Sequence, residues 1–599
     1  SSFSNEFMKI FCGISKRRNK DQMKRYGKYI RPCWYAFILG PLLMLTEVAG
    51  EVLLPSFMAD IINVGAANHD VGYILQKGMI MILTAFIMMA GGVGGAWFAS
   101  VAAINFGTGL RKDAFKKIQT FSFSEIDRFS TGSLVTRLTN DITQVQNLIM
   151  MALRMMLRAP GMLIGAIIMA FLMDRELAAV FLIVLPVMTV VILLLLRIAY
   201  PRFEFMQKKL DALNSNIQEV LTNVRVIKSF VREDYESARF EKSNAELKES
   251  SLNAFKIAVA QMPLMMLFMN LTTLVVVWLG GNQILGGKMQ VGDLTAFTTY
   301  IVQVLMSLMM LAMVFLQSSR AFASGRRINE VMDTKVSLTD DHAAYPEAVV
   351  KNGKIEFQNV SFRYYKDSAE KVLDQINLTI EPGQMIGIIG STGCGKTTLV
   401  SMIPRLYDVD EGKVLVDGID VRDYSLNHLR EGVGMVLQKN VLFSGTIEEN
   451  LQWGDENADK DQIREAAESA QAEGFIQKLA DGYDTELGQG GVNVSGGQKQ
   501  RLCIARALLK RPKILILDDS TSAVDTATEA RIREAFSTTL KETTKLIIAQ
   551  RIGSVMEADQ IIVMDGGKIV GLGKHEALLE TCKAYQEIYD SQMKKEVIA

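Results

Sequence analysis

The sequence predicts two consecutive domains of different fold class, an α-helical domain that spans a membrane and then an α/β domain. Two observations carry this prediction. All long apolar segments of the 599-residue chain lie before about residue 320, and each is near the ~20 residues that a helix needs to cross a bilayer. Near residue 350 the composition changes to short strands, glycine turns and charged helices. A single compact domain is not expected, because domains typically contain about 100–200 residues.

Composition excludes several other classes of protein. The chain has 65 Lys and Arg against 65 Asp and Glu, so no global charge draws it to nucleic acid. Hydrophobic residues make up 49% and charged residues 22%, which excludes a mainly disordered chain. The five cysteines are few and scattered, which favours a reducing compartment over a disulfide framework or a zinc cluster. No short cleavable apolar core follows the basic N-terminus, so a secretory signal peptide is not expected.

Six apolar segments are expected to cross the membrane as helices. They cover residues 34–57, 79–103, 150–172, 177–196, 258–279 and 294–316. Six segments of this length in a row are hard to bury in a water-soluble core, so membrane spans are the better interpretation. We interpret residues 34–325 as the membrane domain. Residues 1–33 are expected to form a cytoplasmic segment that ends in an interfacial helix at about 22–33.

Positive charge gives the expected orientation. Lys and Arg are concentrated in the N-terminal segment and in the connections after the second and fourth spans, whereas the other three connections are short and poor in them. By the positive-inside rule, both termini and these two connections lie in the cytoplasm. The two connections, about 104–149 and 197–257, are rich in helix formers and nearly free of proline. They are therefore expected to be long helical extensions of the spans, turning near 126–132 and near 227–237.

Four charged residues lie inside the apolar segments. Glu47 and Glu51 are four residues apart in the first segment, and Arg154 and Arg158 have the same spacing in the third, so each pair shares a helix face. Counted back from the expected outer ends, Glu47 and Arg154 lie at one depth. Glu51 and Arg158 lie together one turn further out. Since unpaired charge in hydrocarbon costs several kcal/mol, three interpretations stay open: a structural ion-pair ladder, contacts to a charged substrate, and exposure to a cytoplasmic cavity.

The sixth segment is rich in methionine. Met306, Met309, Met310 and Met313 lie within eight residues of each other. Methionine adapts its shape, so these side chains could form a cavity wall for apolar ligands. A packing or lipid-facing stripe is the simpler interpretation.

The second domain begins with a phosphate-binding pattern. An apolar strand at 385–389 leads into a loop that fits G-x-x-x-x-G-K-[ST]. Its residues are Gly390, Ser391, Thr392, Gly393, Cys394, Gly395, Lys396, Thr397 and Thr398. The glycines let backbone N–H groups point at phosphates, Lys396 reaches the terminal phosphates, and Thr397 can hold Mg²⁺. Cys394 occupies a free position and needs no special role.

A carboxylate suited to Mg²⁺ follows a second strand. The apolar run 514–517 ends in Asp518, at the strand end where a P-loop enzyme holds its metal. The sequence therefore predicts a site for ATP and Mg²⁺.

Between these two motifs lies Ser495-Gly496-Gly497-Gln498. With this sequence the chain resembles the ATP-binding cassette (ABC) transporter superfamily, and six spans with a fused nucleotide-binding domain resemble its exporters. The resemblance implies a linker at 326–350 and, at 351–599, an α/β P-loop domain of the RecA-like type with a helical subdomain. It also implies that two such domains face each other, each ATP lying between one P-loop and the other domain's signature, where Ser495 and the N–H groups of Gly496 and Gly497 form an anion site.

Other positions match the family residue by residue. Tyr364, in Phe-Arg-Tyr at 362–364, resembles the aromatic residue that stacks on adenine. Gln438 resembles the Q-loop glutamine, which senses Mg²⁺ and the attacking water. Residues 522–525 (Ser-Ala-Val-Asp) resemble the D-loop that joins the two ATP sites. The turns near 126–132 and 227–237 resemble the two coupling helices.

Two positions depart from the family pattern. Asp519 stands where the family usually has the glutamate that polarises the attacking water, and Gln550 stands where the switch loop usually has histidine. Aspartate is one methylene shorter, so its carboxylate is expected to fall short in a site built for glutamate. Glutamine can hydrogen-bond a phosphate but cannot carry a proton as imidazole does. Lys396, Gln438, Asp519 and Gln550 are therefore the candidate catalytic residues, of which the last two predict slow hydrolysis.

This pattern resembles the degenerate half of a heterodimeric exporter. It implies a second, non-identical half-transporter that carries the missing glutamate and histidine, in addition to the lipid bilayer and a small amphipathic substrate, drug-like or lipid-like. The resemblance to bacterial exporters implies the plasma membrane. Two alternatives stay open, a homodimer with unusual working sites and a membrane-bound ATP-sensing regulatory subunit. A soluble P-loop enzyme with a membrane anchor is disfavoured by the six spans and the signature.

Overall fold

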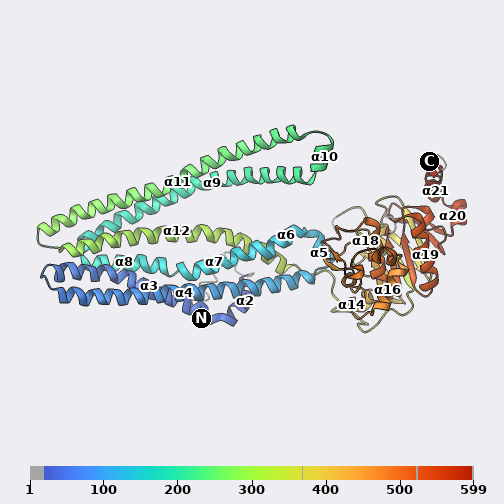
Figure 1. The fold of residues 1–599 in the computed structure, drawn as a ribbon, viewed down its shortest axis with the longest axis horizontal. Helices are drawn as coiled ribbons and strands as arrows, with labels where there is room; N and C mark the ends of the chain where they lie inside the picture. Colours follow the sequence, from blue (N-terminus) through green and yellow to red (C-terminus); the bar gives the residue numbers. More distant parts are fainter. Residues whose placement is uncertain (1–18, 367, 521–523, 597–599) are drawn as a thin grey trace. The chain divides into compact units, whose positions relative to one another are not determined.

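The chain divides into two compact units. The computed structural model describes residues 19–366, 368–520 and 524–596. One unit comprises Ser1–Gln119 and Gly132–Asp333, and the other comprises Thr120–Thr131 and Thr334–Ala599. The first is helical and the second contains every strand assigned in the described residues (Figure 1).

The first unit is built from long helices. Its elements are α2 (Asn19–Ile30), a 3-10 turn (Arg31–Cys33), α3 (Trp34–Asp60), a π-helical turn (Ile61–Ala66), α4 (Val71–Gln119), α6 (Thr131–Thr136), a π-helical turn (Arg137–Asp141), α7 (Ile142–Met155), α8 (Arg158–Met173), α9 (Arg175–Thr222), α10 (Val224–Ser229), α11 (Glu233–Leu285) and α12 (Val291–Asp333). Among the described residues, six helical stretches are long and apolar enough to cross a membrane. The six predicted apolar helices are therefore confirmed.

The four longest of these helices, α4, α9, α11 and α12, are much longer than the ~20 residues that cross a bilayer. The helices α9 and α11 have 48 and 53 residues and run side by side as an antiparallel pair, with the short helix α10 where the chain turns (Figure 1). The predicted helical extensions of the spans are thus present. The turn at α10 begins a few residues before the expected 227–237.

The helix α12 also continues further than expected. It reaches Asp333, although residues from 326 onward were expected to be a linker. Helix formers fill this stretch, and two ion pairs hold it against the other helices of the unit. Arg327 Nε lies 2.8 Å from Asp141 Oδ2, and Arg25 Nη2 lies 2.7 Å from Asp333 Oδ1. Local composition alone did not reveal these long-range contacts.

The charges in the membrane segments pair differently from the depth prediction. Arg158 Nη2 lies 3.1 Å from Glu47 Oε1 and 3.0 Å from Glu51 Oε1, so one guanidinium serves both carboxylates. Arg154 is exposed and forms no ion pair within the described residues. The reason is a break in the helix at Met156–Leu157, which interrupts the regular spacing of the two arginines. The expected pairing of Glu47 with Arg154 is therefore wrong.

The methionines of α12 do not share one role. Met309 packs against the buried core between the membrane helices. Met306 and Met313 are 43% and 59% exposed on this chain. Met309 therefore contributes to packing, and Met310 is half-buried.

The second unit contains two main sheets. A four-stranded antiparallel sheet has the order β2 (Leu373–Ile380), β1 (Ile355–Phe362), β4 (Glu411–Val416), β5 (Ile419–Asp420). A six-stranded sheet has the order β12 (Lys568–Gly573), β11 (Gln560–Asp565), β3 (Met385–Gly390), β10 (Thr544–Ile548), β9 (Ile514–Asp518), β6 (Val433–Val436). Its strands are parallel except β12. Two short strands, β7 (Gly445–Thr446) and β8 (Glu486–Leu487), form a separate pair.

Helices flank these sheets. They are α13 (Lys396–Ser401), α14 (Leu426–Glu431), α15 (Ile447–Leu451), α16 (Lys460–Ser469), α17 (Glu473–Ile476), α18 (Gly496–Leu509), α19 (Thr526–Thr539), α20 (His575–Thr581) and α21 (Lys583–Glu596). The helices α15–α18 share one apolar core with the strand β9. This arrangement is the expected α/β domain with a helical subdomain.

One short helix from the α4–α6 connection belongs to the second unit. It is α5 (Phe123–Arg128), which Ser122 and Glu125 cap at its N-terminus. The Tyr407 hydroxyl donates to Asp127 Oδ2 at 2.9 Å, and the rings of Tyr407 and Phe123 lie 6.1 Å apart. The first predicted turn is therefore a helix that packs on the α/β unit.

Small residues allow α3 and α4 of the first unit to pack closely. A Cβ atom at Gly91 of α4 would lie 2.9 Å from the backbone oxygen of Leu43 and 2.2 Å from Thr46 Oγ1 on α3. At Gly78, on the same helix, a Cβ atom would meet nothing within 4 Å. Glycine at position 91 is therefore required by the approach of α3, and glycine at position 78 is not.

Gly91→Ala is expected to destabilise the protein by about 1–3 kcal/mol, the range for overpacking a tight contact. Gly78→Ala, the matched control, is expected to cause no loss. Thermal unfolding in one detergent, followed by intrinsic fluorescence, measures both. Equal midpoints for the two variants would contradict the close contact.

Candidate nucleotide-binding site

The glycine-rich loop has the backbone that phosphate binding requires. Gly390, Gly393 and Gly395 have φ values of 153°, 83° and 97°, in the region where side chains are strained. A Cβ atom at Gly390 would lie 2.1 Å from the Met564 carbonyl oxygen. The loop runs from the end of β3 into α13 and lines a cavity of about 830 Å³. The expected strand, loop and helix are all present.

Lys396 is folded onto the loop that it ends. Its Nζ donates to the carbonyl oxygens of Gly390 and Ser391 at 2.9 and 2.8 Å, and it lies 3.7 Å from Cys394 Sγ. Cys394 is only 4% exposed and packs in the core of the unit, as expected for a small structural residue. Lys396 can therefore turn to a phosphate by leaving two carbonyls at the cavity wall.

Thr397 and Asp518 form an oxygen pair at the cavity. The Thr397 hydroxyl lies 3.1 Å from Asp518 Oδ1. Asp518 Oδ2 is shielded from solvent and has no hydrogen-bond partner within the described residues. Burial raises the pKa of Asp518 above its usual range, and the hydrogen bond from Thr397 offsets part of this shift. A hydroxyl beside a carboxylate oxygen with a free position fits the oxygen ligands that Mg²⁺ prefers.

Asp519 is held by two amide side chains. Gln550 Nε2 donates to Asp519 Oδ2 at 2.6 Å, and Gln438 also hydrogen-bonds this carboxyl group. Burial raises the pKa of Asp519, which the two hydrogen bonds and Lys396 partly counteract. The residue has a φ of 49°, which is uncommon for a side chain other than glycine, asparagine or aspartate. The two positions that depart from the family pattern are thus in direct contact.

Tyr364 lies at the rim of the same cavity. Its ring is 43% exposed, and its hydroxyl lies 2.9 Å from Thr398 Oγ1. The Tyr407 ring, which also contacts α5, meets the Tyr364 ring edge to face at 5.2 Å. An exposed aromatic face beside a phosphate loop can stack on a base.

The signature residues lie elsewhere in the unit. Ser495 caps α18, since its hydroxyl accepts from Gln498 N at 3.3 Å and its N–H donates to Gln498 Oε1 at 2.8 Å. Ser495 and Gly496 are exposed, and neither they nor Gly497 and Gln498 line the nucleotide cavity. The structure therefore brings together the P-loop, Tyr364, Gln438, Asp518, Asp519 and Gln550, and it leaves the signature apart.

Comparisons with known proteins agree with this site. Residues 37–308 match the ABC transporter transmembrane region, and residues 373–522 match the ABC transporter family. The chain is 41% identical to the uncharacterized ABC transporter ATP-binding protein YfiB of Bacillus subtilis over 96% of this chain and 99% of that protein. The chain belongs to the ABC transporter family.

More distant members are also similar. An ATP-dependent lipid A-core flippase of Desulfotalea psychrophila is 34% identical over 81% of this chain and 82% of its own length. A solved structure of a bacterial Atm1-family ABC exporter with ATP bound superposes with a TM-score of 0.76 at 25% identity, covering 94% of this chain and 98% of that one. This ABC transporter is therefore a multi-pass exporter half whose ATPase domain couples ATP hydrolysis to transport.

The predicted D-loop is only partly described. Ser522 and Ala523 lie outside the described residues. Val524 is buried, and Asp525 caps α19 by accepting from Thr528 N at 2.9 Å. These hydrogen bonds lower the pKa of Asp525.

Sequence patterns missed the C-terminal helix of the transporter as part of the site. Residues of α21 line the nucleotide cavity. Gln592 Nε2 donates to the Gln550 carbonyl at 2.8 Å, and Gln592 Oε1 accepts from Ile552 N at 2.8 Å. One side chain thus holds the backbone on both sides of Arg551. No motif signals this glutamine, because it lies 42 residues beyond Gln550 on a polar helix.

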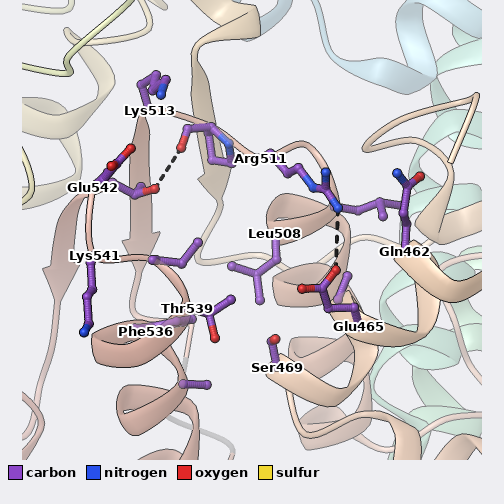
Figure 2. A pocket seen from close by; sticks show the side chains of 16 residues that line it. Gln462, Glu465, Ser469, Leu508, Arg511, Lys513, Phe536, Thr539, Lys541 and Glu542 are labelled. Carbon is purple, nitrogen blue, oxygen red and sulfur yellow. Dashed lines mark hydrogen bonds and ion pairs between the residues drawn. The ribbon is translucent and has the colours of Figure 1, made fainter.

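A second cavity lies at the opposite end of the strands of the six-stranded sheet, where β9 and β10 begin. It has a volume of about 460 Å³ and lies before the amino ends of β9 and β10, between α16, α18 and α19 (Figure 2). Arg511 Nη2 and Glu465 Oε2 approach to 3.5 Å at its wall, and Leu508 and Phe536 lie against it. None of the predicted site residues lines this cavity, so it is separate from ATP binding.

Asp518→Asn is expected to raise the thermal stability of the nucleotide-free protein at pH 7.5. A carboxyl whose pKa is raised by folding favours the folded state only when protonated, so its charge disfavours folding above the raised pKa. The gain should therefore shrink as the pH falls toward about 4, where the carboxyl is protonated also in the unfolded chain. The same substitution should abolish stabilisation by Mg²⁺ with ATP.

Asp525→Asn is the matched control, because its pKa is lowered and it should give no gain at pH 7.5. Differential scanning fluorimetry at several pH values measures both variants. A loss of stability for Asp518→Asn at pH 7.5 would contradict the burial effect.

Gln592→Ala is expected to weaken ATP binding at this site about three- to fivefold, as the loss of about one net hydrogen bond predicts. Gln592→Glu keeps the acceptor for Ile552 N but turns a second carboxylate oxygen toward the Gln550 carbonyl oxygen, so it should weaken binding at least as much. Ser591→Ala is the control, since Ser591 bonds only Ile588 within its own helix. Binding of a fluorescent ATP analogue measures the three variants, and unchanged affinity in Gln592→Ala would exclude a positioning role.

Proposed function

We propose that this chain is the degenerate-site half of a heterodimeric exporter. The observation that carries the proposal is the contact between Gln550 and Asp519, at 2.6 Å, beside an intact P-loop and Asp518. The parts that hold ATP are therefore complete, and the two that activate water are both altered. The transporter would bind ATP tightly at this site and hydrolyse it slowly.

The geometry around Asp519 gives a physical reason for slow hydrolysis. A general base must reach the attacking water and take its proton. The Asp519 carboxylate is one methylene shorter than glutamate and is already engaged by the amides of Gln438 and Gln550. An amide has no titratable nitrogen near neutral pH, so Gln550 cannot pass a proton on. Each effect lowers the rate without removing a contact to ATP.

The remaining residues divide the work of binding. The backbone N–H groups of the P-loop hold the phosphates, Lys396 turns from the Gly390 and Ser391 carbonyls to the terminal phosphates, and Tyr364 stacks on adenine. Thr397 and Asp518 would hold Mg²⁺, which when bound neutralises charge on the phosphate oxygens. Gln438 hydrogen-bonds the Asp519 carboxyl group and lines the same cavity as this pair.

The exposed signature supports a two-chain site. Ser495 and Gly496 lie at the N-terminus of the 14-residue helix α18 and outside the chain's own nucleotide cavity. A helix N-terminus with free N–H groups attracts phosphate. In the proposed heterodimer this signature completes the partner's ATP site, which carries glutamate and histidine and hydrolyses ATP at a normal rate.

Two short helices support coupling between ATP and the membrane helices. On α5, Asp127 and Phe123 contact Tyr407, whose ring in turn meets Tyr364 at the nucleotide cavity. After α10, Phe230 and Val231 are 71% and 80% exposed. We infer that α5 acts as a coupling helix on the chain's own domain. The exposed apolar residues after α10 would contact the nucleotide-binding domain of the partner.

The proposed cycle follows from these contacts. ATP that binds both faces favours the closed pair of nucleotide-binding domains, because only the closed pair contacts ATP from both sides. The coupling helices pass this closure to the spans, and hydrolysis at the partner's site reverses it. The substrate is a small amphipathic molecule. The positive charge of the N-terminal segment and of the two long connections supports a plasma-membrane orientation with both termini in the cytoplasm.

Mass spectrometry of the complex purified with this chain from its native host tests the heterodimer. The expected result is a second half-transporter of similar size that carries glutamate and histidine at the corresponding positions. Recovery of this chain alone would favour a homodimer. Absence of ATP-driven uptake by vesicles that contain the intact complex would favour the ATP-sensing subunit instead.

Asp519→Glu combined with Gln550→His is expected to raise ATP turnover at this site at least about tenfold, because a positioned general base is worth ~10²–10⁴. The protein used is the purified heterodimer whose partner chain carries glutamine in place of its catalytic glutamate, so that turnover at this site is measured. Adding Lys396→Ala to the same background should abolish the gain and serves as the control. Steady-state release of phosphate measures all three proteins. Equal turnover in the wild type and the double variant would show that these two positions do not limit hydrolysis.

A further inference from the structure

A cluster of charged and polar side chains lies inside the membrane unit. It comprises Glu47 and Glu51 on α3, Arg158 on α8 and Gln303 on α12, and we name it the membrane carboxylate cluster. Arg158 Nη2 contacts Glu47 Oε1 at 3.1 Å and Glu51 Oε1 at 3.0 Å. Gln303 Nε2 donates to the Glu51 carbonyl at 2.8 Å. Three helices that are far apart in sequence therefore bring their polar groups to one place.

Among the buried atoms of the cluster that lack a hydrogen-bond partner, acceptors outnumber donors. Glu47 Oε2, Glu51 Oε2 and Gln303 Oε1 are shielded from solvent and have no hydrogen-bond partner within the described residues. The only donor atom of the cluster in the same condition is Arg158 Nε. One guanidinium faces two carboxylates, so the cluster carries an excess negative charge. Such orphaned groups in a low-dielectric setting are costly unless a donor reaches them.

Part of the cluster reaches the surface of the described chain. The side chains of Glu47, Glu51 and Arg158 keep 18%, 25% and 23% of their exposure. Charged side chains in membrane segments face a water-filled cavity or a protein partner and not hydrocarbon. Gly92 on α4 covers one side of the Glu47 carboxylate, since a Cβ atom there would lie only 3.0 Å from Glu47 Cδ and Oε2. A ligand therefore has to approach the cluster from the side on which these side chains remain exposed.

An apolar wall lies next to the acceptors. Met306 follows Gln303 by three residues on α12, so the two share a helix face. Met306 is 43% exposed, and its flexible thioether adapts to ligands of different shape. Acceptors beside a deformable apolar wall fit a molecule with a charged donor at one end and an apolar body.

We propose that the membrane carboxylate cluster binds the ammonium group of a cationic amphiphile, whose apolar body lies against Met306. This proposal rests on the proposed transport of a small amphipathic molecule and names its charge. An ammonium group offers three N–H donors and a positive charge, and the partly exposed side chains of Glu47 and Glu51 offer the excess negative charge that attracts it. Substrates with a neutral or anionic head lack this attraction.

Substitution of Arg154 provides a test in which the affinity for the ammonium group should change in the opposite direction. It lies four residues before Arg158, across the helix break at Met156–Leu157, and its exposed guanidinium forms no ion pair within the described residues. A cation nearby opposes the binding of another cation. Removal of this charge should therefore strengthen ammonium binding, whereas removal of a carboxylate charge should weaken it.

The experiment uses the intact transporter in lipid nanodiscs and two fluorescent probes. Dansylcadaverine carries a primary ammonium group, and its N-acetyl derivative has the same body with a neutral amide. Fluorescence anisotropy without ATP, corrected with empty nanodiscs, gives the affinity for each. Wild type is expected to prefer dansylcadaverine. Glu47→Gln should weaken dansylcadaverine binding about tenfold, and Arg154→Gln should strengthen it about threefold, while the acetylated probe changes in neither variant.

Three outcomes would overturn the proposal. They are equal binding of the two probes by wild type, equal loss of both probes in Glu47→Gln, and a decrease with Arg154→Gln. Glu51→Gln provides the same test if Glu47→Gln does not fold. The proposed transport is tested separately, by ATP-driven uptake into vesicles. Uptake of the neutral probe without binding of the amine would refute the ammonium site and leave the exporter function standing, and binding without uptake would do the reverse.

Discussion

The alignment of three parallel strands is the constraint on which the ATP site depends. Ile388 of β3 pairs with Ile548 of β10, and Ile548 pairs with Asp518 of β9. The P-loop, the Asp518–Asp519 pair and the loop with Gln550 therefore leave the sheet at the same end of its strands, although the P-loop lies more than 100 residues before the other two. A register shift of one residue would turn Asp518 to the other face of the sheet. The backbone pairing of a buried sheet thus decides which side chains can meet a nucleotide.

Buried charge is concentrated at this end of the strands for a functional reason. Asp518 and Asp519 are nearly buried, and burial raises the pKa of both. Without a ligand, such carboxylates disfavour the folded state at neutral pH. A bound nucleotide with its metal removes this disadvantage. The same buried carboxylates therefore destabilise the ligand-free protein and favour binding of the ligand. The amides of Gln438 and Gln550 hydrogen-bond the Asp519 carboxyl group and so stabilise its charged form. The same hydrogen bonds occupy the carboxylate oxygens that hydrolysis would need.

In the membrane unit too, polar and charged groups are costly when they are buried without a partner. Lipid cannot satisfy backbone polar groups, so the spans are helices, and a charge inside them is costly unless another side chain or water meets it. Arg158 meets two glutamates and leaves their second oxygens without donors. In both units, polar groups that the chain itself does not satisfy lie where we propose that another molecule binds. The aromatic contacts Tyr364–Tyr407–Phe123 join the nucleotide cavity to α5.

The sequence alone determined what depends on local pattern. Apolar length gave the six helices, and the spacing of Gly390, Gly395 and Lys396 gave the strand, loop and helix that hold phosphate, because each signal lies within one element. The contacts that only the tertiary structure decided join elements distant in sequence. Depth counting paired Glu47 with Arg154, and a helix break at Met156–Leu157 gave both glutamates to Arg158 instead. Gln592 clamps the backbone around Arg551 from a helix without any motif. The end of α12 at Asp333 depends on ion pairs to Asp141 and Arg25. Such pairings depend on how the helices and strands pack, which residue spacing along one element does not contain.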